Sequence, residues 1–328
     1  MSASKILITG ITGQDGVFLS SYLLNNIENI EIFGTTRSKD NTNFYKKLTK
    51  ISKEQEDTNR VNLINLDLMN SKDVIGFVKN SQVDKIAHLS GPSSVYNSYL
   101  HPEKSKNIIL TQFENLVQGC IQNNLYPSFF QASSSEMFAN TSDLPLSEAS
   151  EMTPRSPYAS AKYKLHKKVT DLRKTKDWNI KSGIMFNHES EFRQNEFLIM
   201  KVVNGLIEIK ESRSSELVVG SLEYSRDWTY AADTVRAISS ILFEETPTDY
   251  VIGSGRGYTI LNMIKIVSQY FDINYEEFIK TDESLLRKGD PTEIISDPKL
   301  IYNNLGWEVE TTFEKMIEKI IEFRLSNL

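Results

Sequence analysis

The stretch Lys5–Gly16 is the part of the sequence that most constrains the fold. Lys5–Gly10 (K-I-L-I-T-G) is an apolar run without alternation, which is typical of a parallel strand buried on both faces. Gly10, Gly13 and Gly16 follow, and a helical pattern begins directly after them. Glycines in such a loop let the backbone approach a pyrophosphate held at the helix N-terminus, although a plain tight turn is the alternative. The stretch therefore predicts the first strand, loop and helix of a dinucleotide-binding α/β fold.

Short apolar runs alternate with helical patterns through the first half of the chain. We expect further strands at Ile30–Thr36, Val61–Asp67, Lys85–Ser90, Ser128–Ser133 and Ile180–Asn187, and helices at Pro102–Asn124 and from Pro157 to about Lys174. The alternation predicts a Rossmann-like, doubly wound parallel sheet of the α/β class.

The pattern loosens after Asn187. We expect helices near Phe197–Ile209, Ala232–Phe243, Thr259–Tyr270 and Thr312–Arg324, and short strands at Leu217–Val219 and Tyr250–Ile252. We interpret this half as a smaller, partly interleaved substrate domain. The predicted division gives residues 1–187 and 222–249 to the cofactor domain, and residues 188–221 and 250–328 mainly to the substrate domain.

The composition excludes several classes of protein. The 328 residues suffice for one large core or two interlocked ones, and 39% hydrophobic with 24% charged residues is typical of a soluble globular chain. A net charge of −6 argues against a nucleic-acid surface. The single Cys120 suits a reducing cytosol, and no apolar run approaches the ~18 residues that span a bilayer. We expect a cytoplasmic protein with no metal site.

Residues after the second and third predicted strands bear on the choice of cofactor. Thr35, Thr36 and Arg37 occupy the place where an NAD site has an acidic residue for the ribose. Arg37 could pair with a 2′-phosphate, which favours NADP; NAD and a merely solvated arginine are the alternatives. Asp67 and Leu68 are well placed to meet an adenine edge.

An acid–base set follows the fifth predicted strand. Residues 131–138 read Q-A-S-S-S-E-M-F, and residues 157–162 read P-Y-A-S-A-K. If Pro157 starts a helix, Tyr158 and Lys162 are an i,i+4 pair on one face. An ammonium there should lower the tyrosine pKa from its usual ~10, so that the phenol can take a proton from an alcohol.

Several motifs together resemble one enzyme family. They are G-I-T-G-Q-D-G at residues 10–16, S-S-S-E at 133–136, Tyr158-x-x-x-Lys162, and F-N-H-E-S at 186–190. The chain resembles the GDP-mannose 4,6-dehydratase family of the extended short-chain dehydrogenase/reductases. The likeness continues to R-D-W at residues 226–228 and L-G-W at 305–307, so it covers nearly the whole chain. The first and last of the four motifs are specific, whereas Tyr-x-x-x-Lys indicates only the superfamily.

The resemblance implies roles for individual residues. The catalytic set is Ser134, where the family usually has threonine, with Glu136, Tyr158 and Lys162. The set expected at the cofactor is Gly10, Thr12, Gly13, Gln14, Asp15, Gly16, Arg37, Asp67, Leu68, Leu89, Ser90, Tyr158, Lys162 and His188. The set expected at a nucleotide-diphosphate sugar is Ser93, Asn187, Lys201, Arg226 and Arg287. NADP and a homodimer or homotetramer are also implied.

The implied reaction converts GDP-mannose or a close relative to its 4-keto-6-deoxy product with internally recycled NADP. Tyr158, helped by Lys162, would take the C4 hydroxyl proton while C4 gives a hydride to NADP⁺. The ketone acidifies the C5 proton, which Glu136 would remove as water leaves C6; the hydride would then return to C6. Ser134 would hydrogen-bond the C4 oxygen.

The chain departs from the family at positions that would face the substrate. The family's two successive arginines after the second strand are here Arg37-Ser38, and its P-R-R-G-A-N becomes E-F-R-Q-N-E at residues 191–196. Glu196 is unfavourable beside a diphosphate. Pro92 and Ser94 replace a glutamine and a histidine, and residues 287–297 form a shorter segment than in the family. The sugar and the base therefore stay open.

Other functions fit parts of the pattern. A 4-keto-sugar reductase or a nucleotide-sugar epimerase needs Tyr158 and Lys162 but no C5 base such as Glu136. A uronate decarboxylase can carry a similar hydroxyl–glutamate run, and a non-catalytic NADP-binding protein is a further alternative. Structural interpretations also exist: Glu136 as a surface carboxylate, His188 as a packed side chain and Arg226 as half of a salt bridge.

Overall fold

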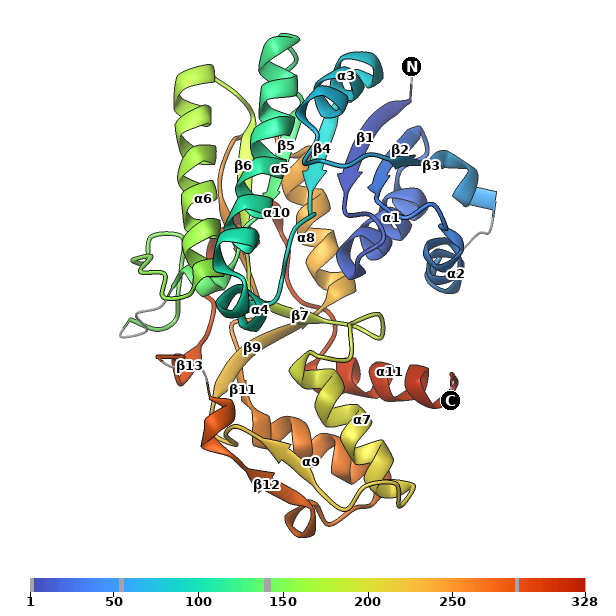
Figure 1. The fold of residues 1–328 in the computed structure, drawn as a ribbon, viewed down its shortest axis with the longest axis vertical. Helices are drawn as coiled ribbons and strands as arrows, with labels where there is room; N and C mark the ends of the chain where they lie inside the picture. Colours follow the sequence, from blue (N-terminus) through green and yellow to red (C-terminus); the bar gives the residue numbers. More distant parts are fainter. Residues whose placement is uncertain (1–2, 53–55, 139–142, 287–288, 328) are drawn as a thin grey trace.

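A seven-stranded parallel sheet forms the larger part of the computed structural model, which describes residues 3–52, 56–138, 143–286 and 289–327 (Figure 1). In spatial order the strands are β10 (Tyr250–Ile252), β6 (Ile180–Met185), β5 (Ser128–Ala132), β4 (Lys85–His88), β1 (Ser4–Thr9), β2 (Ile30–Thr36) and β3 (Val61–Asn65). The central strands are apolar on both faces; Ile6, Leu7 and Ile8 of β1 are all fully buried.

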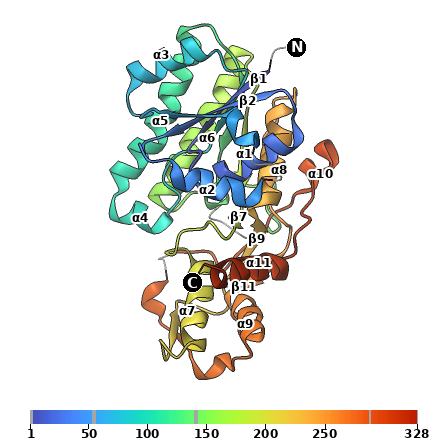
Figure 2. The same cartoon turned by 90° about the vertical axis from the view of Figure 1, so that its right-hand side faces the viewer.

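Helices cover both faces of this sheet (Figure 2). One face carries α3 (Ser71–Ser81), α4 (Val95–Leu100), α5 (Pro102–Gln122) and α6 (Pro157–Lys176), and the other carries α1 (Gln14–Asn26) and α8 (Ala231–Phe243). Helix α2 (Thr42–Ile51) packs beside α1, and α10 (Lys299–Leu305) packs beside β10. The predicted doubly wound α/β sheet is confirmed.

The smaller part lies at the carboxyl ends of the main strands (Figure 1). Its central strand β9 (Ser225–Tyr230) pairs with β7 (Asn187–Glu189), β11 (Gly257–Thr259) and β13 (Glu293–Ile294), while β8 (Leu217–Val219) pairs with β12 (Ile279–Thr281). Helices α7 (Leu198–Lys210), α9 (Ile260–Phe271) and α11 (Phe313–Leu325) pack around these strands.

The structure corrects two expectations about the strands. The sixth strand, expected to reach Asn187, ends at Met185, and the chain leaves the main sheet to form β7 beside β9. The strand Tyr250–Ile252, expected within the substrate segment, is instead the edge strand of the main sheet, paired with Gly183–Met185. Strand β9 was not expected, because its S-R-D-W-T-Y sequence has no apolar pattern although all of it is buried.

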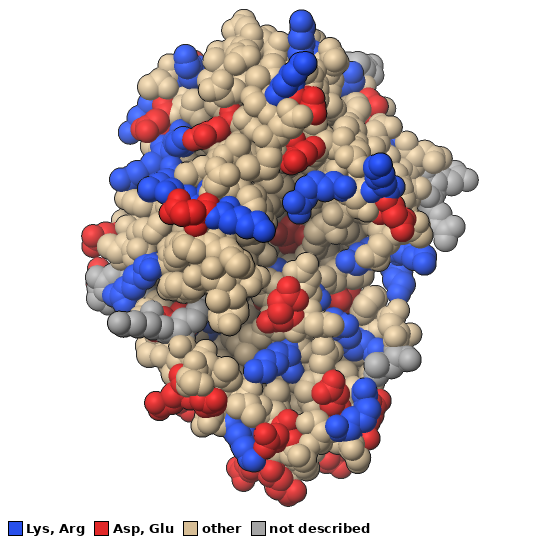
Figure 3. Space-filling model, in the orientation of Figure 1, with Lys and Arg blue, Asp and Glu red and all other residues tan. Residues whose placement is uncertain are grey.

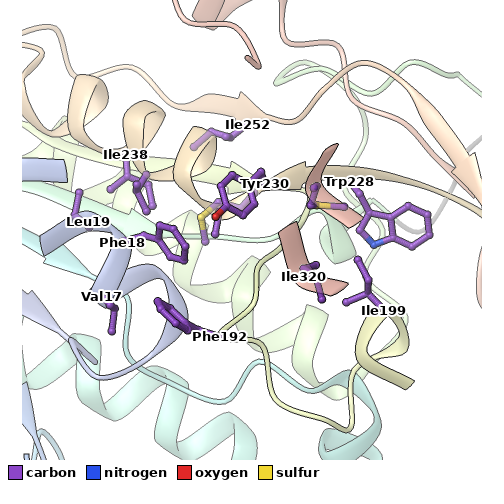
Figure 4. Packing of buried hydrophobic residues seen from close by; sticks show 14 of the residues in the cluster. Val17, Phe18, Leu19, Phe192, Ile199, Trp228, Tyr230, Ile238, Ile252 and Ile320 are labelled. Atoms are coloured by element: carbon purple, nitrogen blue, oxygen red, sulfur yellow. The ribbon is translucent and has the colours of Figure 1, made fainter. Parts of the chain in front are cut away.

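Aromatic packing joins the helix after the glycine loop to the smaller part (Figure 4). The ring of Phe18 in α1 lies 5.5 Å from that of Phe192 and 5.6 Å from that of Tyr230, centroid to centroid. Phe192 in turn packs edge-on against Phe323 of α11 at 5.6 Å. Such pairs contribute about 0.5–1.5 kcal/mol each beyond their buried area, so this contact fixes the glycine loop against the segment that follows β7.

The distribution of surface charge and the character of the helices agree with the mixed charge and moderate hydrophobicity of the sequence. Acidic and basic side chains are interspersed over the face shown in Figure 3. Within the described ranges, no helix combines the length and the apolar character needed to cross a membrane.

Candidate active site

The glycine loop between β1 and α1 is closely packed. Gly10 has φ +68°, and a Cβ there would lie 2.9 Å from Cα of Ser90, so a side chain would clash with the loop after β4. A Cβ at Gly16 would lie 2.5 Å from Cα of Ile11. The N–H of Gly13 donates to the carbonyl oxygen of Gly10 at 3.0 Å. These contacts bring the N-terminus of α1 against the carboxyl end of the sheet.

A cavity of about 480 Å³ opens over this loop. Most of the residues expected at the cofactor line it: Gly10, Thr12, Gly13, Gln14, Asp15, Gly16, Arg37, Leu68, Leu89 and Ser90. A cradle that a Cβ would fill, next to a helix N-terminus, fits a dinucleotide pyrophosphate. The residues that line this cavity therefore fit a dinucleotide. Their individual contacts with it remain predictions.

Asp67 is the expected cofactor residue that the structure places differently. Its carboxylate accepts a hydrogen bond from the N–H of Met69 at 3.0 Å, while Leu66 and Leu68 line the cavity on either side. The reason is that β3 ends at Asn65, so Asp67 begins a turn.

His88, which the sequence did not single out, holds the loop after β4. The hydroxyl oxygen of Thr9 accepts hydrogen bonds from the N–H groups of Leu89 and Ser90, at 3.1 and 3.2 Å, and lies 2.7 Å from Nδ1 of His88. Burial, with the nearby charge of Lys162, lowers the pKa of His88 to about 3. His88 is therefore neutral, and its Nδ1 accepts the hydroxyl proton of Thr9.

A second cavity of about 410 Å³ adjoins the first. Asp15, Leu89 and the 91–93 loop line both cavities. The sequence-predicted residues that line the second one are Ser93, Ser134, Glu136, Tyr158, Lys162, Asn187, His188 and Arg226. The whole predicted catalytic set thus meets in one space.

Tyr158 and Lys162 lie on the first turns of α6, as expected. The Ser156 hydroxyl caps this helix by accepting from the N–H of Ala159 at 3.0 Å, and the N–H of Tyr158 donates to Oγ of Ser98 at 3.2 Å. Nζ of Lys162 lies 5.7 Å from the centroid of the Tyr158 ring and donates to the carbonyl oxygen of Ala132 at 2.9 Å. Both side chains are buried.

The expected lowering of the Tyr158 pKa is absent in the protein alone. Burial raises the pKa of Tyr158 to about 12, and the hydrogen bond with Ser134 offsets only part of this. Burial also lowers the pKa of Lys162 to about 8. The expectation fails because it considered only the attraction between the two side chains, whereas desolvation penalises both charged forms.

Ser134 and Glu136 follow the carboxyl end of β5. The hydroxyl of Ser134 accepts from the N–H of Glu136 at 3.3 Å, which starts the short 3₁₀ helix η2 (Ser135–Met137). Ser134 also hydrogen-bonds Tyr158, and the charge of Glu136 contributes to raising the Tyr158 pKa. The phenol, the hydroxyl and the carboxylate therefore face the same part of the cavity.

The two family-specific motifs contact each other. The side-chain amide of Gln14 donates to the carbonyl oxygen of His188 at 3.1 Å, and the Ser190 hydroxyl donates to Oε1 of Gln14 at 2.8 Å. Asp15 and His188 form a partly buried ion pair, with Nε2 of His188 3.1 Å from Oδ2 of Asp15. Burial would raise the pKa of Asp15, but the His188 charge and hydrogen bond lower it to about 2.

Arg193 lines both cavities and was not singled out from the sequence. Its Nε lies 2.8 Å from Oε2 of Glu189, and its guanidinium carbon lies 3.6 Å above the centroid of the Phe197 ring. The available signal was an arginine retained in the altered segment 191–196. Glu196, from the same segment, also lines the second cavity.

Of the three cations expected to contact the diphosphate, the structure places one at the second cavity. Arg226 lines the second cavity, but its Nη2 lies 3.1 Å from Oδ1 of Asp290 in a buried ion pair. Lys201 is exposed on α7 and does not line the cavity. Arg287 falls outside the described residues. These roles stay predictions.

A family model and an individual relative of known sequence both match this chain, and both are described by the same enzyme name. The family model described as GDP-mannose 4,6 dehydratase matches residues 7–320. The chain is 30% identical over 322 residues to GDP-mannose 4,6 dehydratase 2 of Arabidopsis thaliana. The aligned region covers 96% of this chain and 85% of that protein.

Solved structures show the same fold at lower identity. DesIV, a dTDP-glucose 4,6-dehydratase from Streptomyces venezuelae with NAD and TYD bound, superposes with a TM-score of 0.84 at 19% identity, covering 98% of this chain and 97% of that one. RMD from Pseudomonas aeruginosa, complexed with NADPH, superposes with a TM-score of 0.79 at 20% identity, covering 99% and 100%.

Proposed function

Since this chain belongs to the GDP-mannose 4,6-dehydratase family of hydro-lyases, we propose that it converts GDP-mannose or a close relative to the 4-keto-6-deoxy sugar with internally recycled NADP. The observation that carries the proposal is that Glu136 shares one cavity with Tyr158 and Ser134. A dehydratase needs a carboxylate for the C5 proton next to the phenol that acts at C4, and this cavity holds both.

Tyr158 and Ser134 act at the C4 oxygen. When bound, the nicotinamide would supply the hydride acceptor for C4 and the hydride donor for C6. Tyr158 removes the hydroxyl proton, and Ser134, already hydrogen-bonded to the phenol, steadies the oxygen as it becomes a ketone. The pKa of about 12 holds for the protein alone. A bound nicotinamide cation near the phenol would favour the phenolate, and the Lys162 ammonium would add to this effect.

Glu136 acts at C5. Once C4 is a ketone, the proton on C5 is acidic; the carboxylate of Glu136 takes it and passes it to the departing C6 hydroxyl, which leaves as water. Its position in η2, directly after β5, places it on the side of the cavity where Ser134 and Tyr158 also lie. A proton then returns to C5, balanced by the one that Tyr158 took from the C4 hydroxyl, which completes a reaction without net redox change.

The nucleotide and the cofactor are finer parts of the proposal. The names of the family model and of the plant relative support GDP-mannose. Arg37 in the first cavity and the absence of an acidic residue at Thr35–Thr36 support NADP. Glu196, at a position where the family has an asparagine, lines the second cavity and supports a sugar site that differs from that for GDP-mannose itself.

Product mass tests the function directly. Purified protein supplied with NADP⁺ is incubated with GDP-mannose and, separately, with other GDP-, CDP- and UDP-hexoses, without a reductant. A product lighter by one water, formed while NADPH neither accumulates nor disappears, supports the dehydratase. Stoichiometric oxidation of added NADPH on a 4-keto sugar, without water loss, indicates a reductase instead. The Tyr158→Phe variant is the matched control, since it should form no product.

A further inference from the structure

Arg37 and Lys47 are two cationic side chains that line the first cavity in addition to the glycine loop. Arg37 follows β2, and Lys47 comes from the second turn of α2; both line the cavity together with Thr36. We propose that Lys47 is the second cation of a site for the 2′-phosphate of the dinucleotide, beside Arg37. This rests on the NADP part of the proposed function and names a residue that its motifs do not include.

The turn between β2 and α2 brings Lys47 back towards the cavity. The N–H of Ser38 donates to Oγ1 of Thr36 at 3.0 Å, and the Ser38 hydroxyl donates to the carbonyl oxygen of Asp40 at 2.7 Å. The N–H of Thr42 then donates to the Asp40 carboxylate at 2.9 Å. These bonds reverse the chain within a few residues, so α2 returns alongside the end of β2.

The rotation of α2 decides which of its lysines reaches the cavity. Phe44 and Leu48, one turn apart, are buried with 2% and 0% of their surface exposed. Lys47 lies next to this buried stripe, is half-buried and lines the cavity, whereas Lys46 is exposed and does not. Nζ of Lys47 lies 5.3 Å from the centroid of the Phe192 ring, which lines the same cavity.

Neither cation is neutralised by a carboxylate within the described part of the chain, where the contact of Lys47 is with an aromatic ring. A half-buried ammonium that lacks a counter-ion gains more from a bound phosphate than an exposed one does. Lys47 thereby supplies a second positive charge beside Arg37, since the next residue after Arg37 is the uncharged Ser38. NAD, which lacks the 2′-phosphate, gains nothing from this site.

Equilibrium binding tests the proposal without any sugar. Isothermal titration calorimetry of nucleotide-free protein compares NADP⁺ with NAD⁺, which differ only by the 2′-phosphate. The variant is Lys47→Met, which keeps the apolar stem over Phe192, and the control is Lys46→Met, the same charge change on an exposed position. We expect wild-type protein to prefer NADP⁺, and Lys47→Met to weaken NADP⁺ binding by about tenfold while NAD⁺ binding is unchanged.

Three results would overturn the proposal. They are no preference for NADP⁺ in the wild type, an equal loss for both dinucleotides in Lys47→Met, or an equal effect of Lys46→Met. An equal loss of NADP⁺ and NAD⁺ binding would mean that Lys47 contacts the pyrophosphate or stabilises the fold instead. Because no sugar is present, the outcome does not depend on whether the dehydratase assignment holds, and that assignment is tested by product mass alone.

Discussion

Nε2 of His188 lies 3.1 Å from Oδ2 of Asp15, while its Nδ1 lies 2.8 Å from the carbonyl oxygen of Phe186. Both oxygens accept hydrogen bonds and cannot donate them, so both ring nitrogens carry a proton and His188 is a cation. Burial works against that charge, but the Asp15 carboxylate outweighs it and raises the pKa of His188. The ion pair joins the glycine loop to β7.

Replacing Asp15 by asparagine should lower the free energy of unfolding by about 1–3 kcal/mol, because it leaves a partly buried imidazolium without its counter-charge. The raised pKa of His188 gives stability that is present below the unfolded value of ~6.5 and lost as the pH rises through the folded value. The lowered pKa of Asp15 gives stability that is lost only as the pH falls towards about 2. The difference between variant and wild type should therefore be largest between about pH 4 and pH 6.5.

Urea unfolding at about pH 5.5 and about pH 9 measures this difference. Asp171→Asn, the same change at an exposed position on α6, is the control and should have little effect at either pH. An Asp15→Asn variant with the same loss at both pH values would show that the pair is not ionic.

The phenol of Tyr158 should titrate near 12 in the protein without dinucleotide. Adding NADP⁺ should lower this pKa, since a cation beside the ring favours the phenolate. Ultraviolet difference titration of wild type against Tyr158→Phe isolates this tyrosine from the others in the chain. A pKa that is unchanged by NADP⁺ would contradict the proposed role of Tyr158 as a base at neutral pH.

The Glu136→Gln variant should separate the two chemical stages. Amide nitrogen cannot accept the C5 proton, so water loss should fall by about 10²–10⁴-fold in kcat. Oxidation at C4 needs only Tyr158 and the cofactor, so a first partial turnover should still produce reduced nicotinamide, measured by its absorbance in single-turnover experiments. Full water loss in this variant would mean that another group removes the proton.

Glu196→Asn should improve substrate binding. Its carboxylate lines the second cavity and is exposed, so its repulsion of a diphosphate is screened and costs about 0.2–1 kcal/mol. We expect KM for the nucleotide sugar to fall by at most about fivefold with kcat unchanged. A rise in KM would instead show that Glu196 accepts a hydrogen bond from the substrate.

The parts of the fold that depend on local sequence could be predicted. The glycine loop, strand β2 and the start of α6 follow from adjacent residues, because their spacing alone determines their geometry. Strand β9 could not be predicted, since its polar residues are buried only by neighbours from distant segments.

The site shows the same limit. Tyr158 and Lys162 were identified from their spacing, but the sign of the Tyr158 pKa shift was wrong, because it depends on burial and on the charge of Glu136 beside the phenol. Lys47 could not be identified, because only the rotation of α2 brings it to a cavity. Arg193 is retained in the altered segment 191–196, but its place at both cavities depends on the course of the chain after β7.

The recycled hydride is the central claim, and an isotope label tests it most directly. The nucleotide sugar that the protein dehydrates is prepared with deuterium at C4 and converted with NADP⁺ and no added reductant. We predict that NMR and mass spectrometry find the deuterium at C6 of the 4-keto-6-deoxy product. Deuterium recovered in the dinucleotide, or lost to solvent, would contradict an internal transfer from C4 to C6.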